Sequence, residues 1–240
     1  IAAMAFGTET ILRTYKIFGP GNQYVTKAKQ LVNQQGTAID MPAGPSEVLV
    51  IADDNANISF VAADLLSQAE HGSDSQVVLV TLNKNLSEQV EKAINEQLLT
   101  LPRRDVASRA LQNSLHLVFT DESDMIDFVN EYAPEHLIIN TENCDLLAEK
   151  IINAGSVFLG QYSPESAGDY ASGTNHTLPT SGYAKAYAGV SLESFTKNIT
   201  FQKITAEGLK TLGPAVEKMA EAEQLMGHKE SVSIRLKSLK

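Results

Sequence analysis

The sequence predicts an α/β protein built on a Rossmann-like sheet with flanking helices, followed by a helical C-terminal extension. Short β-rich runs alternate with amphipathic stretches through the middle of the chain, which is typical of a parallel sheet covered by helices. The first two β-rich runs are continuously apolar, as in strands that are buried on both faces. From about Pro214 onward the sequence becomes rich in Glu, Lys, Met and Ala and has a helical character.

Five strands and five intervening helices are expected. The strands are Val48–Ala52, Val77–Thr81, Leu115–Phe119, Leu137–Asn140 and Ser156–Leu159. The helices lie near Ile58–Glu70, Leu86–Leu99, Asp105–Gln112, Glu122–Tyr132 and Asp145–Asn153. Asn57 and Asp121 are suitable N-caps for the first and fourth of these helices.

The N-terminal part contains a glycine-rich turn, Gly19-Pro20-Gly21-Asn22, ahead of a helical stretch from Tyr24 to Asn33. Glycines before a helix let backbone N–H groups approach an anionic ligand, although this turn lacks the Gly-x-Gly-x-x-Gly dinucleotide fingerprint. An ordinary capped turn is the alternative. The chain starts at Ile1, directly into a stretch that resembles a mid-domain helix and turn, so we expect a fragment or a processed piece.

One segment, Ser163–Gly182, is rich in Gly, Ser, Thr and Pro and has no clear period. It is long for a connection. We therefore expect either a flexible linker or a functional loop.

Composition restricts the class of protein. The chain has 240 residues, 43% of them apolar, which suits a soluble globular protein. A formal net charge of −10 without any basic run argues against nucleic-acid binding. The absence of an apolar run of about 20 residues or a signal peptide argues against a membrane protein, and a cytoplasmic location is expected. The single cysteine, Cys144, excludes an intrachain disulfide and is interpreted as a spectator thiol.

Polar candidates lie at the entrances of several predicted strands. Ser46, His71 and the pair Glu135–His136 each precede a strand, and Gln68 lies three residues before His71 on the same helix face. If the strands are parallel, these side chains gather at one edge of the sheet. Ligands of open α/β sheets usually bind at the opposite, carboxyl edge. Such a site therefore needs walls from the tail, a second subunit or a missing domain.

Several long motifs resemble the histidinol dehydrogenase family. They are Phe18–Asn22, Asp40–Glu47, Leu65–Gly72, Pro134–Leu137 and Ala167–His176. The resemblance covers essentially all of the chain, but members of the family are longer. The chain resembles their carboxyl-terminal half, and the half that carries much of the dinucleotide pocket is missing.

The resemblance implies a zinc ion bound by Gln68, His71, Asp169 and His228. Amide oxygen, imidazole and carboxylate are suitable zinc ligands. Considered alone, these residues have ordinary alternatives as a polar helix end, an imidazole at a helix C-terminus, a turn residue and a surface side chain. Positions implied to bind the substrate are these four ligands together with Ser46, His136, His176 and Glu223.

The resemblance also implies an activity, the oxidation of L-histidinol through histidinaldehyde to L-histidine with two NAD⁺. His136 is then the general base for the alcohol proton, and Glu135 activates the water that adds to the aldehyde. Asn22 contributes to the NAD site. The alternative for Glu135 and His136 is a strand start with two solvent-facing polar residues.

The family forms homodimers in which the C-terminal tail completes the partner's site, so Glu223 and His228 are expected to serve the neighbouring subunit. The expected division is the end of a cofactor-binding domain at 1–46, a Rossmann-like domain with most zinc and catalytic residues at 47–190, and a helical tail at 191–240. A helix that packs on its own domain is the alternative for the tail. Two rival functions remain: a zinc-dependent hydrolase, and a non-catalytic remnant that folds and binds zinc.

Overall fold

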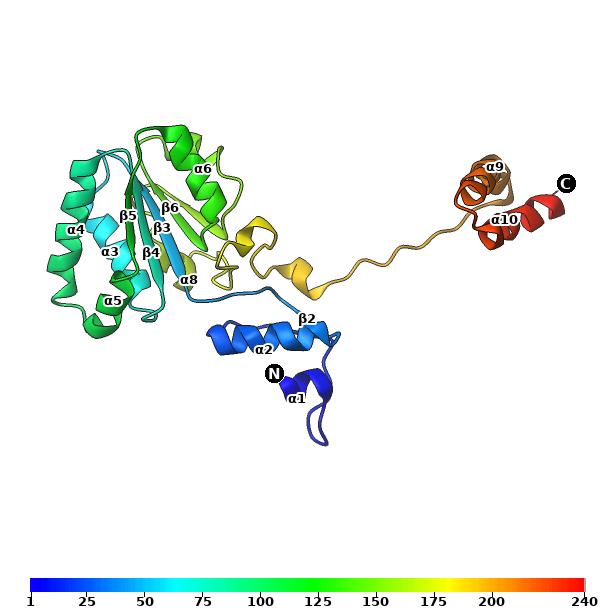
Figure 1. Ribbon diagram of the computed structural model, residues 1–240, viewed down its shortest axis with the longest axis horizontal. Helices are drawn as coiled ribbons and strands as arrows, with labels where there is room; N and C mark the ends of the chain where they lie inside the picture. Colours follow the sequence, from blue (N-terminus) through cyan, green and yellow to red (C-terminus); the bar gives the residue numbers. More distant parts are fainter. Residues whose placement is uncertain (240) are drawn as a thin grey trace. The chain divides into compact units, whose positions relative to one another are not determined.

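The computed structural model describes residues 1–239 and divides into two compact units (Figure 1). The first unit is Ile1–Phe195 and the second begins at Thr196. We describe each unit separately.

The centre of the first unit is a five-stranded parallel sheet in the order β5-β4-β3-β6-β7 (Figure 1). The strands are β3 (Glu47–Ala52), β4 (Gln76–Thr81), β5 (Leu115–Val118), β6 (His136–Asn140) and β7 (Ser156–Leu159). The five predicted strands are confirmed to within one residue at each end. Strand β3 lies between β4 and β6, with Val48 paired to both Val77 and His136.

Helices cover both faces of this sheet. On one face, α3 (Ile58–Ala69), α4 (Lys84–Leu98) and α5 (Arg104–Leu111) pack on alternate strand residues such as Val50 and Leu79. On the other face, α6 (Glu122–Tyr132) and α7 (Cys144–Ala148) pack on the intervening residues such as Leu49. Because both faces are buried, β3 and β4 need continuous apolar sequence, and the Rossmann-like fold class is confirmed.

The predicted helix ends are correct where a cap defines them. The side chains of Asn57 and Asp121 accept backbone N–H groups at the starts of α3 and α6, as predicted. The predicted helix Asp145–Asn153 is too long, since α7 ends at Ala148. Asn130 Oδ1 accepts the backbone N–H of Ile152 at 2.8 Å and so stabilises a non-helical segment before β7.

The N-terminal segment forms a small layer of its own within the first unit. It contains α1 (Ala2–Phe6), β1 (Lys16–Ile17), α2 (Gln23–Gln34) and β2 (Ala38–Ile39), and β1 pairs with β2 in parallel. The buried Lys29 forms an ion pair with Asp40 and donates to the Gly19 carbonyl oxygen at 2.9 Å. Asp40 in turn accepts the Gly19 N–H at 2.8 Å. These contacts fix the turn that leads into α2.

The segment that was expected to lack regular structure contains a short helix, α8 (Glu165–Tyr170). Pro164 precedes the helix in an extended conformation. Gly168 lets the helix approach β7, because a Cβ at this position would lie 2.7 Å from the Phe158 ring. The expectation of a linker or loop is therefore wrong at α8, although the rest of the segment up to η1 (Tyr183–Lys185) is irregular. The first unit ends with η2 (Leu192–Phe195).

The second unit contains two helices, α9 (Ala206–Ala222) and α10 (Met226–Ser238), which pack on each other. The helical region thus begins before the expected Pro214, which lies inside α9. Its start is set by Thr205, whose side chain accepts the Gly208 N–H. No helix within residues 1–239 combines the length and apolarity needed to span a bilayer.

Candidate active site and metal centre

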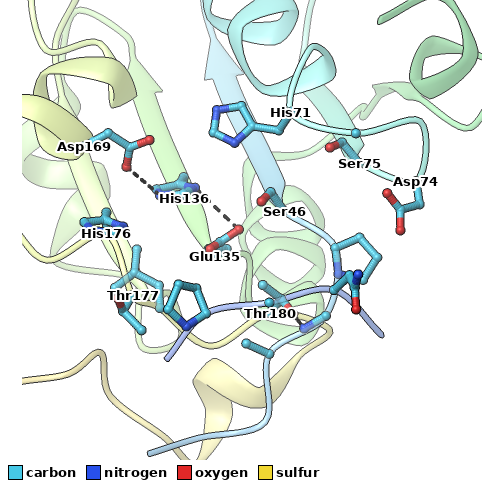
Figure 2. A pocket seen from close by; sticks show the side chains of 18 residues that line it. Ser46, His71, Asp74, Ser75, Glu135, His136, Asp169, His176, Thr177 and Thr180 are labelled. Carbon is cyan, nitrogen blue, oxygen red and sulfur yellow. Dashed lines mark hydrogen bonds and ion pairs between the residues drawn. The ribbon is translucent and has the colours of Figure 1, made fainter. Parts of the chain in front are cut away.

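A cavity of about 330 Å³ opens at the amino edge of the sheet (Figure 2). Ser46 before β3, Ser75 before β4 and Glu135 before β6 all line it. The parallel strands therefore gather the polar side chains at one edge, as the sequence predicts. The remaining walls come from the turn at Pro20–Asn22 and from the irregular segment at His176–Thr180.

Glu135 and His136 are both held by the backbone of Glu47 on the neighbouring strand. The Glu47 N–H donates to Glu135 Oε2 at 2.9 Å. His136 Nδ1 lies 3.0 Å from the Glu47 carbonyl oxygen. A carbonyl oxygen only accepts hydrogen bonds, so we assign the proton of the neutral imidazole to Nδ1. Nε2 therefore carries the free lone pair.

The free nitrogen of His136 points toward two carboxylates. Nε2 lies 3.9 Å from Glu165 Oε1 and 3.9 Å from Asp169 Oδ1 (Figure 2 draws the second contact). His136 is 4% exposed, and burial lowers the pKa of its imidazole from the ordinary value, an effect that outweighs the hydrogen bond to Glu47. The ring is therefore neutral at neutral pH and available as a base.

Glu135 belongs to a group of buried carboxyl groups. Burial raises the pKa of Glu135 to about 9, and the neighbouring Glu47, Glu165 and Asp169 add to this rise, while the Glu47 N–H opposes it. The pKa of Glu47 is raised by burial, and that of Glu165 is raised to about 8, by burial first and by Asp169 second. Such a cluster retains protons unless a cation compensates its negative charge.

Three side chains of this region could hold a metal ion together. One ligand atom each from His71, Glu165 and Asp169 lies within 4.8 Å of the others. Gln68 lies at the end of α3 that contacts α8, where Ser67 Oγ is 3.4 Å from Glu165 Oε2. Gln68 is fully buried, and neither of its amide atoms has a hydrogen-bond partner within the described part of the chain. A buried amide without partners and two adjacent carboxylates fit a divalent cation.

Comparison with known proteins decides the family. The model of the histidinol dehydrogenase family matches residues 1–236. The chain belongs to the histidinol dehydrogenase family. A histidinol dehydrogenase of Bacteroides thetaiotaomicron is 61% identical over 240 residues, which are all of this chain and 56% of the relative. One of Pectobacterium atrosepticum is 55% identical over 242 residues and is covered to 55%.

Solved structures agree with this assignment. The crystal structure of histidinol dehydrogenase from Elizabethkingia anophelis matches with a TM-score of 0.95 and 62% identity, covering 99% of this chain and 55% of that chain. A γ-glutamyl phosphate reductase from Thermotoga maritima has a TM-score of 0.50 at 12% identity, which shows a shared fold alone. The chain thus spans little more than half the length of its histidinol dehydrogenase relatives.

The first unit brings together most of the residues that the family resemblance singles out. Ser46, His71, Asp169 and His176 line the cavity, and so does Asn22. His71 lies in a turn after the end of α3, so the prediction that it shares a helix face with Gln68 is wrong in detail. Its N–H still bonds to the Gln68 carbonyl oxygen at 3.2 Å, which keeps the two residues adjacent.

Asn22 has a local structural role as well. Its side-chain oxygen accepts the N–H groups of Tyr24 and Val25 and caps α2. The capped-turn alternative is therefore correct for this oxygen.

The remaining two candidates belong to the second unit. Glu223 is the C-cap of α9, and His228 lies in the first turn of α10. The two residues therefore lie on either side of the short connection between α9 and α10.

Sequence reasoning missed Glu165 and Glu47. Glu165 precedes Asp169 by four residues, which is the spacing of one helix face, and Pro164 marks a helix start. This sequence signal for a helix was present, but it is only one helical turn long. Glu47 had no comparable signal, because it acts on Glu135 and His136 through its backbone.

Proposed function

We propose that this chain carries the reacting groups of a histidinol dehydrogenase, which oxidises L-histidinol through histidinaldehyde to L-histidine. One observation carries this proposal: His136 Nδ1 is occupied by the Glu47 carbonyl oxygen, on the side of the ring that lies 3.7 Å from Glu135 Oε2, so that Nε2 is left as a free base. The chain spans about 55% of the length of the Pectobacterium atrosepticum relative, so activity is proposed for the assembled protein.

His136 takes part in the first oxidation. Its Nε2 accepts the hydroxyl proton of the alcohol while a hydride leaves the same carbon, which converts the alcohol to the aldehyde. When bound, NAD⁺ accepts the hydride in each of the two oxidations. A neutral imidazole is needed for this step, and burial keeps His136 neutral.

Glu135 takes part in the second oxidation. Its carboxylate accepts a proton from the water as the water oxygen adds to the aldehyde, and the resulting hydrate anion loses a hydride to give the acid. Two separate groups are appropriate because the conversion releases several protons and also consumes a water molecule. Loss of the Glu135 proton is favoured when a nearby cation lowers its pKa.

The proposed metal is zinc, held by Gln68, His71 and Asp169 with His228 as a further ligand. The unpartnered amide of Gln68 and the proximity of His71 to Asp169 support this set. When bound, zinc supplies a Lewis acid that positions and polarises the substrate. Ser46, His176 and Glu223 are proposed substrate contacts, in addition to His136 and the ligands.

We also propose a cytoplasmic homodimer in which the tail of one subunit supplies Glu223 and His228 to the other. The tail helices expose apolar side chains, including Met219, Met226 and Ile234, which supports a role in association. Asn22 lines the cavity that holds His136, which supports its proposed contact with NAD.

The test is NADH formation on addition of L-histidinol and NAD⁺ to the chain, alone and supplemented with the amino-terminal half of a relative. We expect NADH in the assembled protein. Hydrolysis of ester or amide substrates without NADH would favour the rival zinc hydrolase. Inactivity of both samples, with zinc bound, would favour the non-catalytic remnant.

A further inference from the structure

Glu47 carries a buried carboxyl group at the start of β3, in addition to the peptide atoms that hold Glu135 and His136. The residue is 6% exposed. Its Oε1 accepts the backbone N–H of Ser181 at 2.9 Å. This hydrogen bond joins the central strand of the sheet to the irregular segment that follows α8. A buried acid is unfavourable at a strand start unless its oxygens form contacts that an apolar side chain cannot form.

The backbone of Ser181 has a conformation that serine rarely adopts. Its φ is +56°, and the φ of the following Gly182 is +76°. A residue with a Cβ is unfavourable in this left-handed region, and it stays there only where the surrounding contacts impose the conformation. The hydrogen bond to the Glu47 carboxyl group is such a contact.

The same segment is joined a second time, to the loop that precedes β3. The Gly44 N–H donates to Thr180 Oγ1, and Thr180 is buried. The two backbones approach closely, because a Cβ added at Gly44 would lie 3.1 Å from Ser181 Oγ. The loop leads directly to Ser46, which lines the cavity. Two hydrogen bonds therefore connect the strand β3 and its preceding loop with residues 180 and 181.

The segment that is anchored in this way forms one wall of the cavity. Most residues from His176 to Thr180 line the cavity together with Glu135 and His136 (Figure 2). His176 is a proposed substrate contact. The wall is held by the Glu47 side chain, whereas Glu135 and His136 are held by the Glu47 peptide atoms. Loss of the side chain should therefore release the wall and leave the proposed catalytic pair in place.

We propose that the Glu47 side chain is a positioning residue, which fixes the wall at 176–181 relative to Glu135 and His136 so that both contact the substrate. This inference rests on the proposed function and adds to it a residue that acts through the wall. One residue thus has two separable tasks, because a substitution of the side chain keeps the peptide group.

A role as a proton carrier for Glu135 is the main alternative. Burial raises the pKa of Glu47, more than the Ser181 N–H lowers it. Its Oε2 has no hydrogen-bond partner in the described part of the chain. A carrier must release and regain a proton in each reaction, whereas an anchor needs only an oxygen that accepts a hydrogen bond. Glu47→Gln separates the two roles, because it keeps that oxygen and cannot carry the proton.

The first test is the steady-state kinetics of the assembled protein with L-histidinol. Glu47→Ala removes one hydrogen bond from the wall and keeps the peptide group, so KM for L-histidinol should rise by about tenfold while kcat changes by less than about twofold. Glu47→Gln should keep both constants within about twofold. Thr180→Val removes the second connection with little change of volume and should also raise KM alone.

A further variant tests the left-handed turn. Adding Ser181→Gly to Glu47→Ala should recover part of the lost KM, because glycine adopts a positive φ without the cost that serine has. This recovery is not expected if Glu47 acts as a proton carrier.

The second test is amide hydrogen exchange of Ser181 in the full 240-residue chain, which does not depend on the reaction. Glu47→Ala should accelerate this exchange by at least about tenfold, since the Ser181 N–H loses its acceptor. Glu47→Gln should keep the Ser181 N–H protected.

Glu131→Ala is the matched control. Glu131 Oε1 lies 2.6 Å from Lys185 Nζ, a few residues after Ser181, but this ion pair lies at the surface. The variant removes a carboxyl group that binds the same part of the chain. It should change KM and the exchange of Ser181 by less than about twofold, because exposed ion pairs contribute little. Circular dichroism checks the fold of each variant, and Thr180→Val serves if Glu47→Ala does not fold.

Three outcomes decide against the proposals, and they are distinguishable. If Glu47→Ala leaves KM and the exchange of Ser181 unchanged, the side chain is not an anchor, while the proposed function stands. An equal loss of kcat in Glu47→Gln and Glu47→Ala would show a proton carrier and overturn the positioning role. If the unsubstituted assembled protein forms no NADH, the proposed reaction fails, and unchanged exchange of Ser181 in Glu47→Ala would then overturn the anchor as well.

Discussion

At the scale of single residues, the backbone of Glu47 positions both proposed catalytic side chains. Its N–H binds Glu135 and its carbonyl oxygen binds His136, on the strand next to theirs. A carbonyl group orients the imidazole without adding a full negative charge beside Nδ1. This is consistent with a histidine whose pKa is lowered by burial and which stays neutral.

Replacement of His136 by Asn should abolish alcohol oxidation in the assembled enzyme. Loss of a general base typically costs about 10²–10⁴-fold in rate. Zinc content should remain intact, because His136 is not a proposed ligand. The measurements are NADH formation from L-histidinol and zinc content by atomic absorption. Loss of zinc from this variant would indicate a ligand role instead.

Replacement of Glu135 by Gln should flatten the pH dependence of stability in the metal-free chain. The folded-state pKa of Glu135 is about 9, against an ordinary value of 4.5, so the folded state binds more protons between these values. The contribution of Glu135 to the free energy of unfolding is fully present below about pH 4.5. It is lost as the pH rises toward 9, by up to about 1.4 kcal/mol per pH unit.

Urea unfolding between pH 5 and pH 9 in the presence of a chelator measures this slope. The exposed Glu96→Gln is the control, and it should keep the slope of the unsubstituted chain. An unchanged slope in Glu135→Gln would show that Glu135 ionises normally in the folded protein.

The proposed catalytic pair, Glu135 and His136, and His71 could be predicted as neighbours because each precedes a predicted strand and parallel strands share an edge. Glu165 and Glu47 could not be found in the same way. The signal at Glu165 is one helical turn long, and Glu47 acts through peptide atoms, which every residue has. Burial and unpaired oxygens reveal both residues only in three dimensions.

At the scale of elements, the short helix α8 positions the acidic metal candidates. Gly168 lets this helix approach β7, where an added Cβ would lie 2.7 Å from Phe158 and 2.8 Å from Thr174 Oγ1. Phe158 is buried in the core and has little room to move. The packing of α8 therefore depends on the absence of a side chain at residue 168.

Gly168→Ala should lower both stability and zinc affinity. Overpacking typically costs about 1–3 kcal/mol, part of which the better helix propensity of Ala offsets. Because α8 must move, Asp169 and Glu165 move with it. Thermal unfolding and zinc titration measure the two effects.

Gly227→Ala in α10 is the control, since no atom lies within 4 Å of its added Cβ. It should leave zinc affinity unchanged and keep or raise stability. Equal behaviour of the two variants would contradict the proposed packing role of Gly168.

The inner strands β3, β4 and β6 were predictable to within one residue because they are buried along their length, and the caps at Asn57 and Asp121 fixed two helix starts. Elements with weak local sequence signals could not be predicted with this accuracy. Helix α8 has six residues, too few for a hydrophobic period. Helix α7 ends early because Asn130, which is distant in sequence, binds the following backbone.

At the scale of the whole molecule, the cavity lies at the amino edge of a parallel sheet, whereas ligands of such sheets usually bind at the carboxyl edge. The edge becomes usable because residues before β3 and after β7 supply the walls. The edge was predictable because the polar candidates precede strands that are parallel, but these walls were not, because they come from irregular segments. Glu223 and His228 remain predictions, as does the division at residues 46 and 190.

The measurement that tests the central claim most directly is anomalous scattering at the zinc absorption edge from crystals of the zinc-loaded chain. We predict one strong peak at the amino edge of the sheet, within about 2.0–2.2 Å of His71 and Asp169 ligand atoms. Zinc bound elsewhere, for example at His116 or Cys144, with no peak between His71 and Asp169, would contradict the claim.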